Sequence, residues 1–416
     1  MSSIKVLFKD KELRNKLLFS LFLLLVFRIL SHIPVPWVDT STLKEITETG
    51  ILSLTNLFSG GALQSYTFMA TGISAYISAS IVIQLLTYIS PKMHAMSKEA
   101  GGSKKIKKIT IFFGIIAALI SSFVTTIALE KTYGLLFNDS WYVYVVIAIL
   151  QAIGTAIAIA IGETITEKGF GNGVSLLIFI NIASSFPTQI QNIVFSLKND
   201  ITTPLAVFTC VVVMAITIAF VAFLETSEYR LKVLYSQTAI RGQSFGNSNQ
   251  SFFPIKVDLS GVMPIIFASY ILQAISIISY FIKNETINKI LKAFLTSGSP
   301  TYSIFMVVAI ILFSYIYNWL SFDTNDISKN IQERGGTIPG IRPGKPTKVY
   351  IDKIKYDLTF ISAIYLSILT IVPMFIFNLL GITLIASTSL IIMVGVSLET
   401  VKALNVEMNL RKRKNF

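Results

Sequence analysis

Few side chains that could carry out chemistry lie inside the long apolar segments of this chain. Arg28 is the only formal charge well within such a segment, whereas Glu163, Asp357 and Glu399 lie near segment ends. A proton-coupled carrier normally holds a carboxylate or a histidine near the middle of the membrane. The sequence therefore gives little support to such a carrier. The role of Arg28 stays open between a bond to backbone at the helix end and a contact with a small partner subunit.

The chain also lacks the residue patterns of an intramembrane protease or a metal site. Its two histidines, His32 and His94, lie at segment boundaries, and no His-Glu-x-x-His motif occurs. The single cysteine, Cys210, lies inside an apolar run, which excludes a disulfide framework and a cysteine metal site. We therefore expect no catalytic residue, no bound metal and no cofactor.

One glycine-rich run could be mistaken for a phosphate-binding loop. Residues 169–173 read Gly-Phe-Gly-Asn-Gly. A phosphate-binding loop follows a strand and opens a helix, whereas this run joins two apolar segments of helical length. Glycine and asparagine at this density favour a turn. The sequence thus predicts a flexible turn between two membrane helices.

Composition places all of these residues in an integral membrane protein. Of the 416 residues, 53% are hydrophobic and only 14% are charged, and the mean hydropathy is +0.68. The basic start of the chain resembles a signal peptide, but no small-residue cleavage site follows, so we count it as the first span. Ten uncharged runs come close to the ~20 residues that cross a bilayer as a helix. They cover residues 17–27 (extended by 28–33), 72–90, 109–129, 141–161, 173–190, 204–224, 261–282, 302–322, 358–378 and 380–398.

The distribution of basic residues tests how these runs cross the membrane. The net charge of +13 fits basic cytoplasmic loops better than nucleic-acid binding, and we expect no direct DNA binding. With ten spans and a cytoplasmic N-terminus, the inner segments hold 28 Lys and Arg and the outer segments hold six, with Arg28 inside a span. The C-terminus is then cytoplasmic as well. This strong bias supports the ten-span topology.

The charge-free stretch of residues 51–91 is long enough for two spans. Two crossings would leave 10 Lys and Arg inside against 24 outside, which the positive-inside rule rejects. Its first part, residues 51–71, is rich in Ser, Thr, Asn, Gln and Gly. Such backbone lies at membrane depth only where protein or a water-filled cavity shelters it. We therefore expect residues 51–71 to enter from the outer side without crossing, and residues 72–90 to form the single span.

Two inner loops are long, covering residues 225–260 and 323–357. The second contains residues 335–347, GGTIPGIRPGKPT, whose prolines and glycines favour a rigid, non-helical protrusion around Arg342. An exposed basic loop of this kind suits docking of a large cytoplasmic partner. An ordinary tight connection is the alternative, and the length and basicity of the loop favour docking.

Five segments, in the same order along the chain, resemble bacterial SecY, the protein-conducting channel. Each match alone is modestly specific, but five collinear matches over nearly the whole chain are strongly specific. The segments are residues 56–64 (NLFSGGALQ), 77–86 (ISASIVIQLL), 166–175 (TEKGFGNGVS), 261–269 (GVMPIIFAS) and 338–347 (IPGIRPGKPT).

The resemblance implies an all-α multi-pass fold of ten transmembrane helices. It implies two pseudo-symmetric five-helix halves, residues 1–200 and 201–416, which form an hourglass-shaped channel closed by a re-entrant plug. The plug would lie within residues 51–71 and centre on Asn56, Leu57, Phe58, Ser59, Gly60, Gly61, Ala62, Leu63 and Gln64.

The resemblance also implies a constriction ring and a lateral gate. Ile77 and Ile81 are four residues apart and so share a helix face, and Val174 and Ile178 repeat that spacing. An aliphatic collar can close on an extended chain yet resist wetting when empty. Lipid- or core-facing side chains are the alternative, and the alignment favours the ring. The ring is Ile77, Ile81, Ile178, Ile266 and Ile392, with Val174 beside it, and the gate between residues 72–90 and 261–282 carries Gln84 and Gln273, which could hydrogen-bond to each other.

The partners implied by the resemblance are those of a Sec translocase in the cytoplasmic membrane of a bacterium. They are SecE-like and SecG-like small membrane subunits, a SecA-like ATPase motor or the ribosome, membrane lipid, and secretory and membrane polypeptides as substrates. Because the motor or the ribosome supplies the energy, no enzymatic activity is implied for this chain. The docking residues would be Arg342, supported by Arg334 and Lys345, together with Arg230 and Arg241.

The chain departs from the SecY pattern mainly in its cytoplasmic loops. Residues 98–110 read KEAGGSKKIKKIT in place of the usual Glu-Gly-Glu and Gly-Arg-Arg pattern, and Ala75 replaces a familiar proline. Residues 229–238 also lack the usual basic pattern. These changes fit either a divergent housekeeping SecY or an accessory paralogue. The alternative class is a multi-span small-molecule transporter, for which short spans broken by Gly or Pro are expected in both halves.

Overall fold

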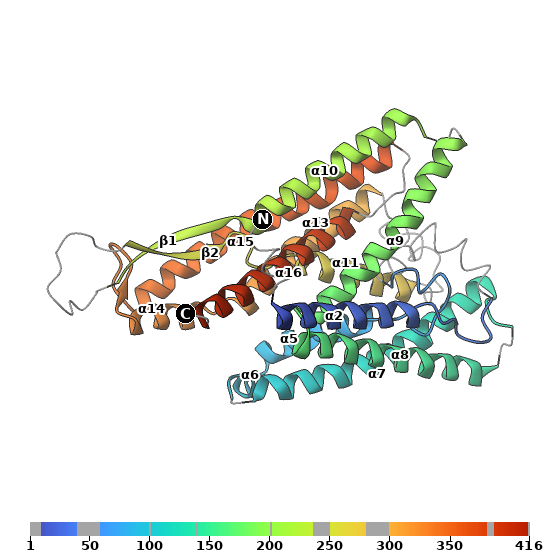
Figure 1. The fold of residues 1–416 in the computed structure, drawn as a ribbon, viewed down its shortest axis with the longest axis horizontal. Helices are drawn as coiled ribbons and strands as arrows, with labels where there is room; N and C mark the ends of the chain where they lie inside the picture. Colours follow the sequence, from blue (N-terminus) through green and yellow to red (C-terminus); the bar gives the residue numbers. More distant parts are fainter. Residues whose placement is uncertain are drawn as a thin grey trace.

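The computed structural model describes residues 10–39, 59–99, 101–137, 140–199, 202–235, 250–279, 299–380 and 387–414. These parts of the chain are mostly helical (Figure 1). The two short helices are α6 (Pro91–Lys98) and α14 (Thr324–Glu333). The longer helices are α2 (Lys11–Leu30), α5 (Ser74–Ile89), α7 (Gly102–Tyr133), α8 (Trp141–Lys168), α9 (Gly173–Lys198), α10 (Pro204–Thr226), α11 (Met263–Ser279), α13 (Pro300–Ser321), α15 (Lys345–Leu379) and α16 (Ser387–Lys414).

Short polar residues set several of the helix starts. Asp10 Oδ1 accepts hydrogen bonds from the first turn of α2, and Asn172 Oδ1 does the same for α9. Thr203 and Ser299 cap α10 and α13, and each is followed by a proline in the first turn. These side chains satisfy backbone N–H groups that the helix itself leaves unpaired. The apolar runs are therefore bounded by local capping chemistry.

Each run predicted to span the membrane overlaps one of the longer helices. Among the described residues, seven helices are long and apolar enough to cross a membrane, or eight if α5 and α6, bent by 97°, form one span. The two others are more polar or shorter, because α2 carries Arg14, Lys16 and Arg28 and α11 has 17 residues. The all-α, multi-pass fold is confirmed.

The helices pack in two groups that follow the chain order. In the first, α7 packs on α5 and α8, while α2 and α9 pack on α8; in the second, α13 packs on α11 and α15, and α10 packs on α15 and α16 (Figure 1). The groups meet where α5 contacts α11 and α13 and where α9 contacts α16. The largest buried apolar cluster includes residues of both groups, among them Ile81, Ile178, Ile266 and Ile392.

A small sheet, which the all-helical prediction did not include, lies at one end of the molecule (Figure 1). β1 (Glu228–Tyr235) pairs antiparallel with β2 (Gln250–Lys256) and with β3 (Gly336–Thr337), in the order β2-β1-β3. Leu231 and Val233 on β1 are buried against α14 and α15. The two long inner loops are therefore joined into one folded unit.

The predicted non-helical protrusion of residues 335–347 is too long at its C-terminal end. α15 begins at Lys345, with Pro346 in its first turn, so the non-helical part ends at Gly344. Proline is compatible with a first helical turn because the N–H that it lacks has no partner there. The preceding loop folds back on itself through an antiparallel bridge between Ile338 and Ile341.

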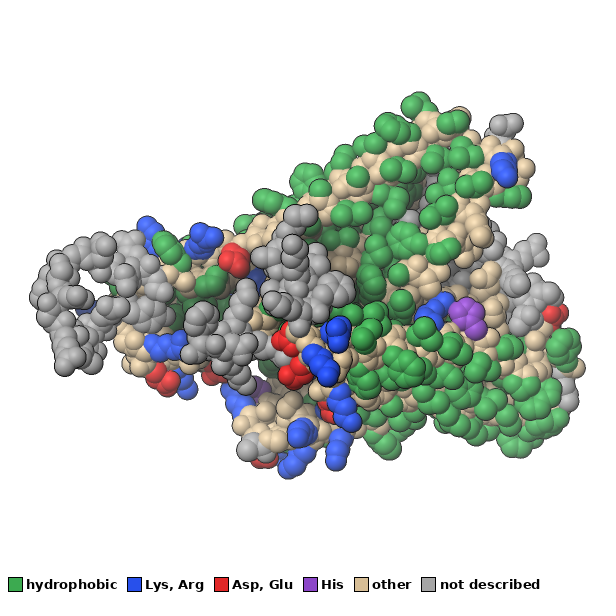
Figure 2. Space-filling model, viewed as in Figure 1, with side chains coloured by type: hydrophobic (Ala, Val, Ile, Leu, Met, Phe, Trp, Pro, Cys, Tyr) green, Lys and Arg blue, Asp and Glu red, His purple; other side chains and the backbone are tan. Residues whose placement is uncertain are grey.

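The surface divides into an apolar and a charged part. Figure 2 shows hydrophobic side chains over the long helices and most Lys, Arg, Asp and Glu side chains toward the end with the sheet, α14 and α6. Phe112 on α7 and Phe208 on α10 are 62% and 66% exposed, respectively. Exposure of large apolar side chains on this scale is expected for helices that face lipid.

Candidate functional site

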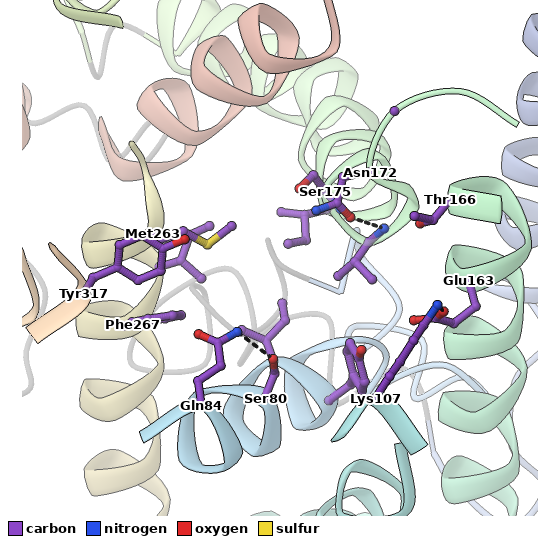
Figure 3. A pocket seen from close by; sticks show the side chains of 16 residues that line it. Ser80, Gln84, Lys107, Glu163, Thr166, Asn172, Ser175, Met263, Phe267 and Tyr317 are labelled. Atoms are coloured by element: carbon purple, nitrogen blue, oxygen red, sulfur yellow. Dashed lines mark hydrogen bonds and ion pairs between the residues drawn. The ribbon is translucent and has the colours of Figure 1, made fainter. Parts of the chain in front are cut away.

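A cavity of about 470 Å³ lies among α5, α7, α8, α9, α11 and α13. In Figure 3, Met263, Phe267 and Tyr317 approach it from α11 and α13, across from Thr166 and Glu163 on α8. Side chains of α5 form another part of the wall. The cavity therefore lies where the two groups of helices meet.

The six predicted ring residues come from four helices and meet in one apolar cluster. Ile77, Ile81, Ile178, Ile266 and Ile392 are buried members of this cluster, and Val174 packs against it. Ile77, Val174, Ile178 and Ile266 line the cavity, whereas Ile81 and Ile392 lie in the cluster away from its wall. We call these six residues the collar.

Polar and charged groups share the cavity with part of the collar. Gln84 Nε2 donates a hydrogen bond to Ser80 Oγ, 3.2 Å away on the same helix (Figure 3). Lys107 pairs with Glu163 and lies 3.6 Å from Glu167. The side chain of Gln273 lies outside the described side chains, so a hydrogen bond between Gln84 and Gln273 stays a prediction.

The glycine-rich run forms a turn, as predicted. α8 ends at Lys168 and α9 begins at Gly173, and Phe170 N donates to Ser20 Oγ of α2. A Cβ atom at Gly173 would lie 1.9 Å from Gly162 O, so the close packing of α8 and α9 requires glycine here. This approach positions Val174 and Ile178 at the cavity wall.

The described part of the predicted plug is a non-helical segment that does not cross the molecule as a helix. Residues 59–73 form consecutive turns, and Ala62 and Leu63 are almost completely buried. Asn56, Leu57 and Phe58 lie outside the described residues. The described members of the predicted plug are Ser59, Gly60, Gly61, Ala62, Leu63 and Gln64.

Backbone and side-chain hydrogen bonds fix this segment to neighbouring helices. Arg28 Nη1 on α2 donates to Gly60 O at 3.1 Å. Pro34 and Thr67 form an antiparallel bridge just after α2. Tyr66 OH lies 2.6 Å from Thr126 Oγ1 on α7. Arg28 thus contacts backbone, as one of the two sequence interpretations held, but the carbonyl lies 32 residues further along the chain.

Contacts between α5–α6 and α13–α14 cross the junction of the two helix groups. The rings of Tyr88 and Trp319 lie 6.1 Å apart. Lys98 Nζ lies 3.7 Å from Asp323 Oδ2, and both side chains are exposed. Sequence reasoning missed this ion pair, because its two residues belong to helices more than two hundred positions apart.

The predicted docking residues lie at the end of the molecule that carries the sheet. Arg230 is on β1, Arg334 caps the C-terminus of α14, and Arg342 and Lys345 lie before and at the start of α15. All four are exposed. Arg241 lies outside the described residues. The structure brings basic residues from both inner loops to the same end of the molecule.

Asp258, which sequence reasoning did not single out, is buried just before α11. Its Oδ1 accepts hydrogen bonds from Gly261 N at 2.9 Å, from Ser260 Oγ at 3.1 Å and from Ser362 Oγ of α15 at 3.2 Å. Burial raises the pKa of Asp258 to about 6 despite these bonds. An aspartate in the run Asp-Leu-Ser-Gly, directly before an apolar segment, was the available sequence signal.

Comparison with known proteins identifies the family. The family model for SecY matches residues 67–401. The SecY translocase subunit of Bacillus subtilis is 35% identical over 418 residues, covering 97% of this chain and 96% of the relative. This chain belongs to the SecY family. A SecY translocase subunit of Streptomyces scabiei is 32% identical over 432 residues, covering 98% of both chains.

Solved structures share the SecY fold at lower sequence identity. A SecY channel studied for its plug domain has a TM-score of 0.69 at 18% identity, covering 94% of this chain and 92% of that one. The yeast Ssh1 complex bound to the 80S ribosome has a TM-score of 0.66 at 15% identity, covering 94% and 90%. The alternative of a small-molecule transporter finds no support among these similarities.

Proposed function

We propose that this chain is the central pore-forming subunit of a Sec-type protein translocase. It passes unfolded secretory polypeptides across the cytoplasmic membrane of a bacterium and releases transmembrane segments into lipid. The observation that carries this function is a collar of aliphatic side chains at the junction of the two helix groups, in a chain that matches SecY over almost its entire length. Both termini lie in the cytoplasm in this proposal, which the distribution of Lys and Arg supports.

The collar forms the seal of the pore. Its side chains come from α5, α9, α11 and α16, so an extended polypeptide that separates these helices passes between aliphatic surfaces. Such surfaces adapt to any side chain and close by dewetting when the pore is empty. Residues 59–64 supply the plug beside the collar, on the outer side predicted by the charge distribution.

Substrates leave sideways between the first and second halves, residues 1–200 and 201–416. The lateral gate is the junction at which α5 contacts α11 and α13, with Gln84 and Gln273 on its two walls. A transmembrane segment gains a few tenths of a kcal/mol for each Leu that it transfers to lipid. This gain favours release of apolar segments through the gate, whereas polar segments continue through the collar.

The sheet end of the molecule docks the cytoplasmic partner. Arg342, Arg334, Lys345 and Arg230 are exposed there, and Arg241 belongs to the same inner loop as β1. A SecA-like ATPase or a ribosome binds this surface and supplies the energy, so we assign no catalytic step to this chain. SecE-like and SecG-like small subunits complete the membrane complex.

Reconstitution of the complex tests this function. Proteoliposomes that hold this chain with its small subunits should convert an added secretory precursor to a protease-protected form when SecA and ATP are present. Arg342→Glu should slow this import far more than it lowers channel abundance, while the exposed Lys353→Glu serves as a control for charge alone. Absence of import in vesicles that hold the assembled complex would contradict the proposal, and an unchanged rate for Arg342→Glu would refute the coupling role of Arg342.

A further inference from the structure

Arg28, for which the proposed pore needs no role, contacts the start of the described plug segment. Its guanidinium Nη1 donates to Gly60 O at 3.1 Å, and the side chain is partly buried within α2. A charged group at membrane depth is costly unless a polar partner compensates it. A backbone carbonyl is such a partner, and the hydrogen bond that it accepts from a guanidinium is stronger than one from a neutral donor.

A second donor reaches the same carbonyl from α9. Ser184 Oγ lies 3.4 Å from Gly60 O and 2.7 Å from Asn181 O. Because a hydroxyl has one proton, Ser184 shares it between these two acceptors, and the shorter bond to Asn181 takes the larger share. Arg28 is therefore the principal partner of Gly60 O, and Ser184 supports it.

The backbone at Gly60 approaches these groups so closely that an added side chain would have to displace Arg28 and Asn181. A Cβ atom at Gly60 would lie 2.7 Å from Arg28 Nη1, 2.8 Å from Asn181 Oδ1 and 3.0 Å from Asn181 Cα. Gly61 provides a contrast, because it also has a positive φ, +85° against +67°, but its Cβ would meet nothing within 4 Å. Both glycines suit the turn, and only Gly60 is needed for the contact.

We propose that Arg28, Gly60 and Ser184 form a plug latch that holds the plug segment in the closed pore. The latch rests on the proposed function, since it assigns residues 59–64 to the plug. Both donors lie on helices of the first group, α2 and α9, and neither lies on α11 or α13 across the gate. Arg28 is thus a positioning residue that sets how often the plug leaves its place, and separation of the gate helices alone does not remove its contact.

A buried reporter cysteine measures plug release directly. Cys210 is the only cysteine of the chain, so Cys210→Ala gives a cysteine-free background. Ala62, 1% exposed, lies two residues beyond Gly60, and Ala62→Cys reacts with a membrane-impermeant maleimide only when the plug segment opens. The reaction is followed from the outer face in spheroplasts that contain the full complex.

Arg28→Gln should raise the modification rate roughly tenfold to a hundredfold, the range expected for loss of a hydrogen bond to a charged group. Gly60→Ala and Gly61→Ala both add backbone strain at a positive φ, but Gly60→Ala should raise the rate clearly further than Gly61→Ala, because only it also displaces Arg28 from the Gly60 carbonyl. Arg28→Lys should lie between the wild type and Arg28→Gln, since it keeps the charge without the planar guanidinium.

A double-mutant cycle separates the latch from general destabilisation. Arg28→Gln should add little to Gly60→Ala, because each change breaks the same contact, and it should keep its full effect in the Gly61→Ala background. Equal rates for Gly60→Ala and Gly61→Ala, or full additivity of Arg28→Gln with Gly60→Ala, would overturn the latch. Channel abundance is measured in parallel to identify any variant that fails to assemble. The modification rates of the variants that do assemble then test the latch.

A stalled secretory chain tests the proposed plug separately from the latch. In the wild-type background, a stalled chain should expose Ala62→Cys to the maleimide. If it does so while Arg28→Gln leaves the basal rate unchanged, the latch is wrong and the plug assignment stands. If the stalled chain leaves the cysteine protected, the proposed plug role itself is wrong.

Discussion

The collar and the segment beside it are held by different physical forces. The collar residues meet through apolar packing, in a cluster to which four helices contribute these side chains. The plug segment also buries apolar side chains such as Leu63, but directional bonds, from Arg28 to Gly60 O and between Tyr66 and Thr126, fix its position in addition. A seal made of apolar contacts re-forms around any shape, whereas a directional bond is either made or broken. The proposed pore thus combines an adaptable seal with a stopper that has a defined closed position.

Directional contacts also occur away from the plug. We call the directional contacts at the plug and those elsewhere the polar fastenings. They are the plug latch, the bond between Tyr66 and Thr126, the bonds of Asp258 before α11, and the ion pair of Lys98 with Asp323. Substitutions in the collar should change how well the closed pore excludes water and ions. Substitutions in the polar fastenings should instead change the equilibria between conformations.

The largest effect is expected for a charge placed in the collar. Ile266→Asp places a carboxylate in the constriction and should allow water to enter it. We expect this to lower the free-energy barrier to ion passage by about 3 kcal/mol, which raises ion leak about a hundredfold. Ile266→Leu keeps the apolar volume and should change leak less than twofold. Conductance of planar bilayers that hold the complex measures both variants. Similar leak for Asp and Leu at this position would contradict the apolar seal.

Asp258 should make stability depend on pH. Its folded pKa of about 6 lies above its ordinary value of 3.8, so the folded state binds the proton more tightly. Stability is therefore greatest below about pH 4 and falls as the pH rises through 6, by at most about 3 kcal/mol. Thermal unfolding in detergent, followed by tryptophan fluorescence, should show this decline relative to Asp258→Asn, which keeps the Oδ1 acceptor. A difference in thermal stability between the two proteins that does not change from pH 4 to pH 7.5 would exclude this effect of Asp258.

The sequence predicted the helices and the collar residues in detail, but not the partners of the polar fastenings. Apolar runs and the bias of Lys and Arg were sufficient for the helices and for the non-crossing segment, and the density of Gly and Asn was sufficient for the turn before Gly173. The spacing of Ile77 and Ile81 placed both on one face of α5. These features follow from local periodicity and from the cost of moving charge across a membrane, which act without knowledge of tertiary contacts.

The fastenings were missed because their partners are distant in the chain. Nothing near Arg28 indicates Gly60 as its acceptor, since the contact depends on how residues 59–73 fold against α2 and α9. The pKa of Asp258 depends on burial beside α15. The sheet was predictable in part, because residues 228–235 alternate between buried Leu231 and Val233 and exposed Arg230 and Lys232.

Loss of the Tyr66 hydroxyl should have a smaller effect on the plug. Thr126 Oγ1 donates to Ser122 O at 2.7 Å, so Tyr66 is the donor in its bond with Thr126. Burial raises the pKa of Tyr66 to about 12, which keeps this proton in place. Tyr66→Phe should cost about 1 kcal/mol and increase exposure of a plug cysteine roughly fivefold. Tyr229→Phe, at an exposed position near the start of β1, is the control, and equal effects of the two changes would count against a fastening at Tyr66.

The smallest effect is expected at the ion pair of Lys98 and Asp323. Both side chains are exposed, so the pair contributes less than about 1 kcal/mol and is screened by salt. Lys98→Gln should change precursor import by less than about threefold, with a larger change at low ionic strength. Import rates in vesicles at two salt concentrations measure this. A large effect that is insensitive to salt would mean that Lys98 acts through a different contact.

Site-specific crosslinking of a translocating chain tests the pore most directly. A secretory chain stalled in the complex, with a cysteine near its midpoint, is oxidised against single cysteines that replace Ile81 or Ile266 in the collar, or the lipid-facing Phe208. The account predicts disulfide bonds to Ile81→Cys and Ile266→Cys and none to Phe208→Cys. Crosslinks to Phe208→Cys without any to the collar positions would contradict the assignment of the collar as the path of the polypeptide.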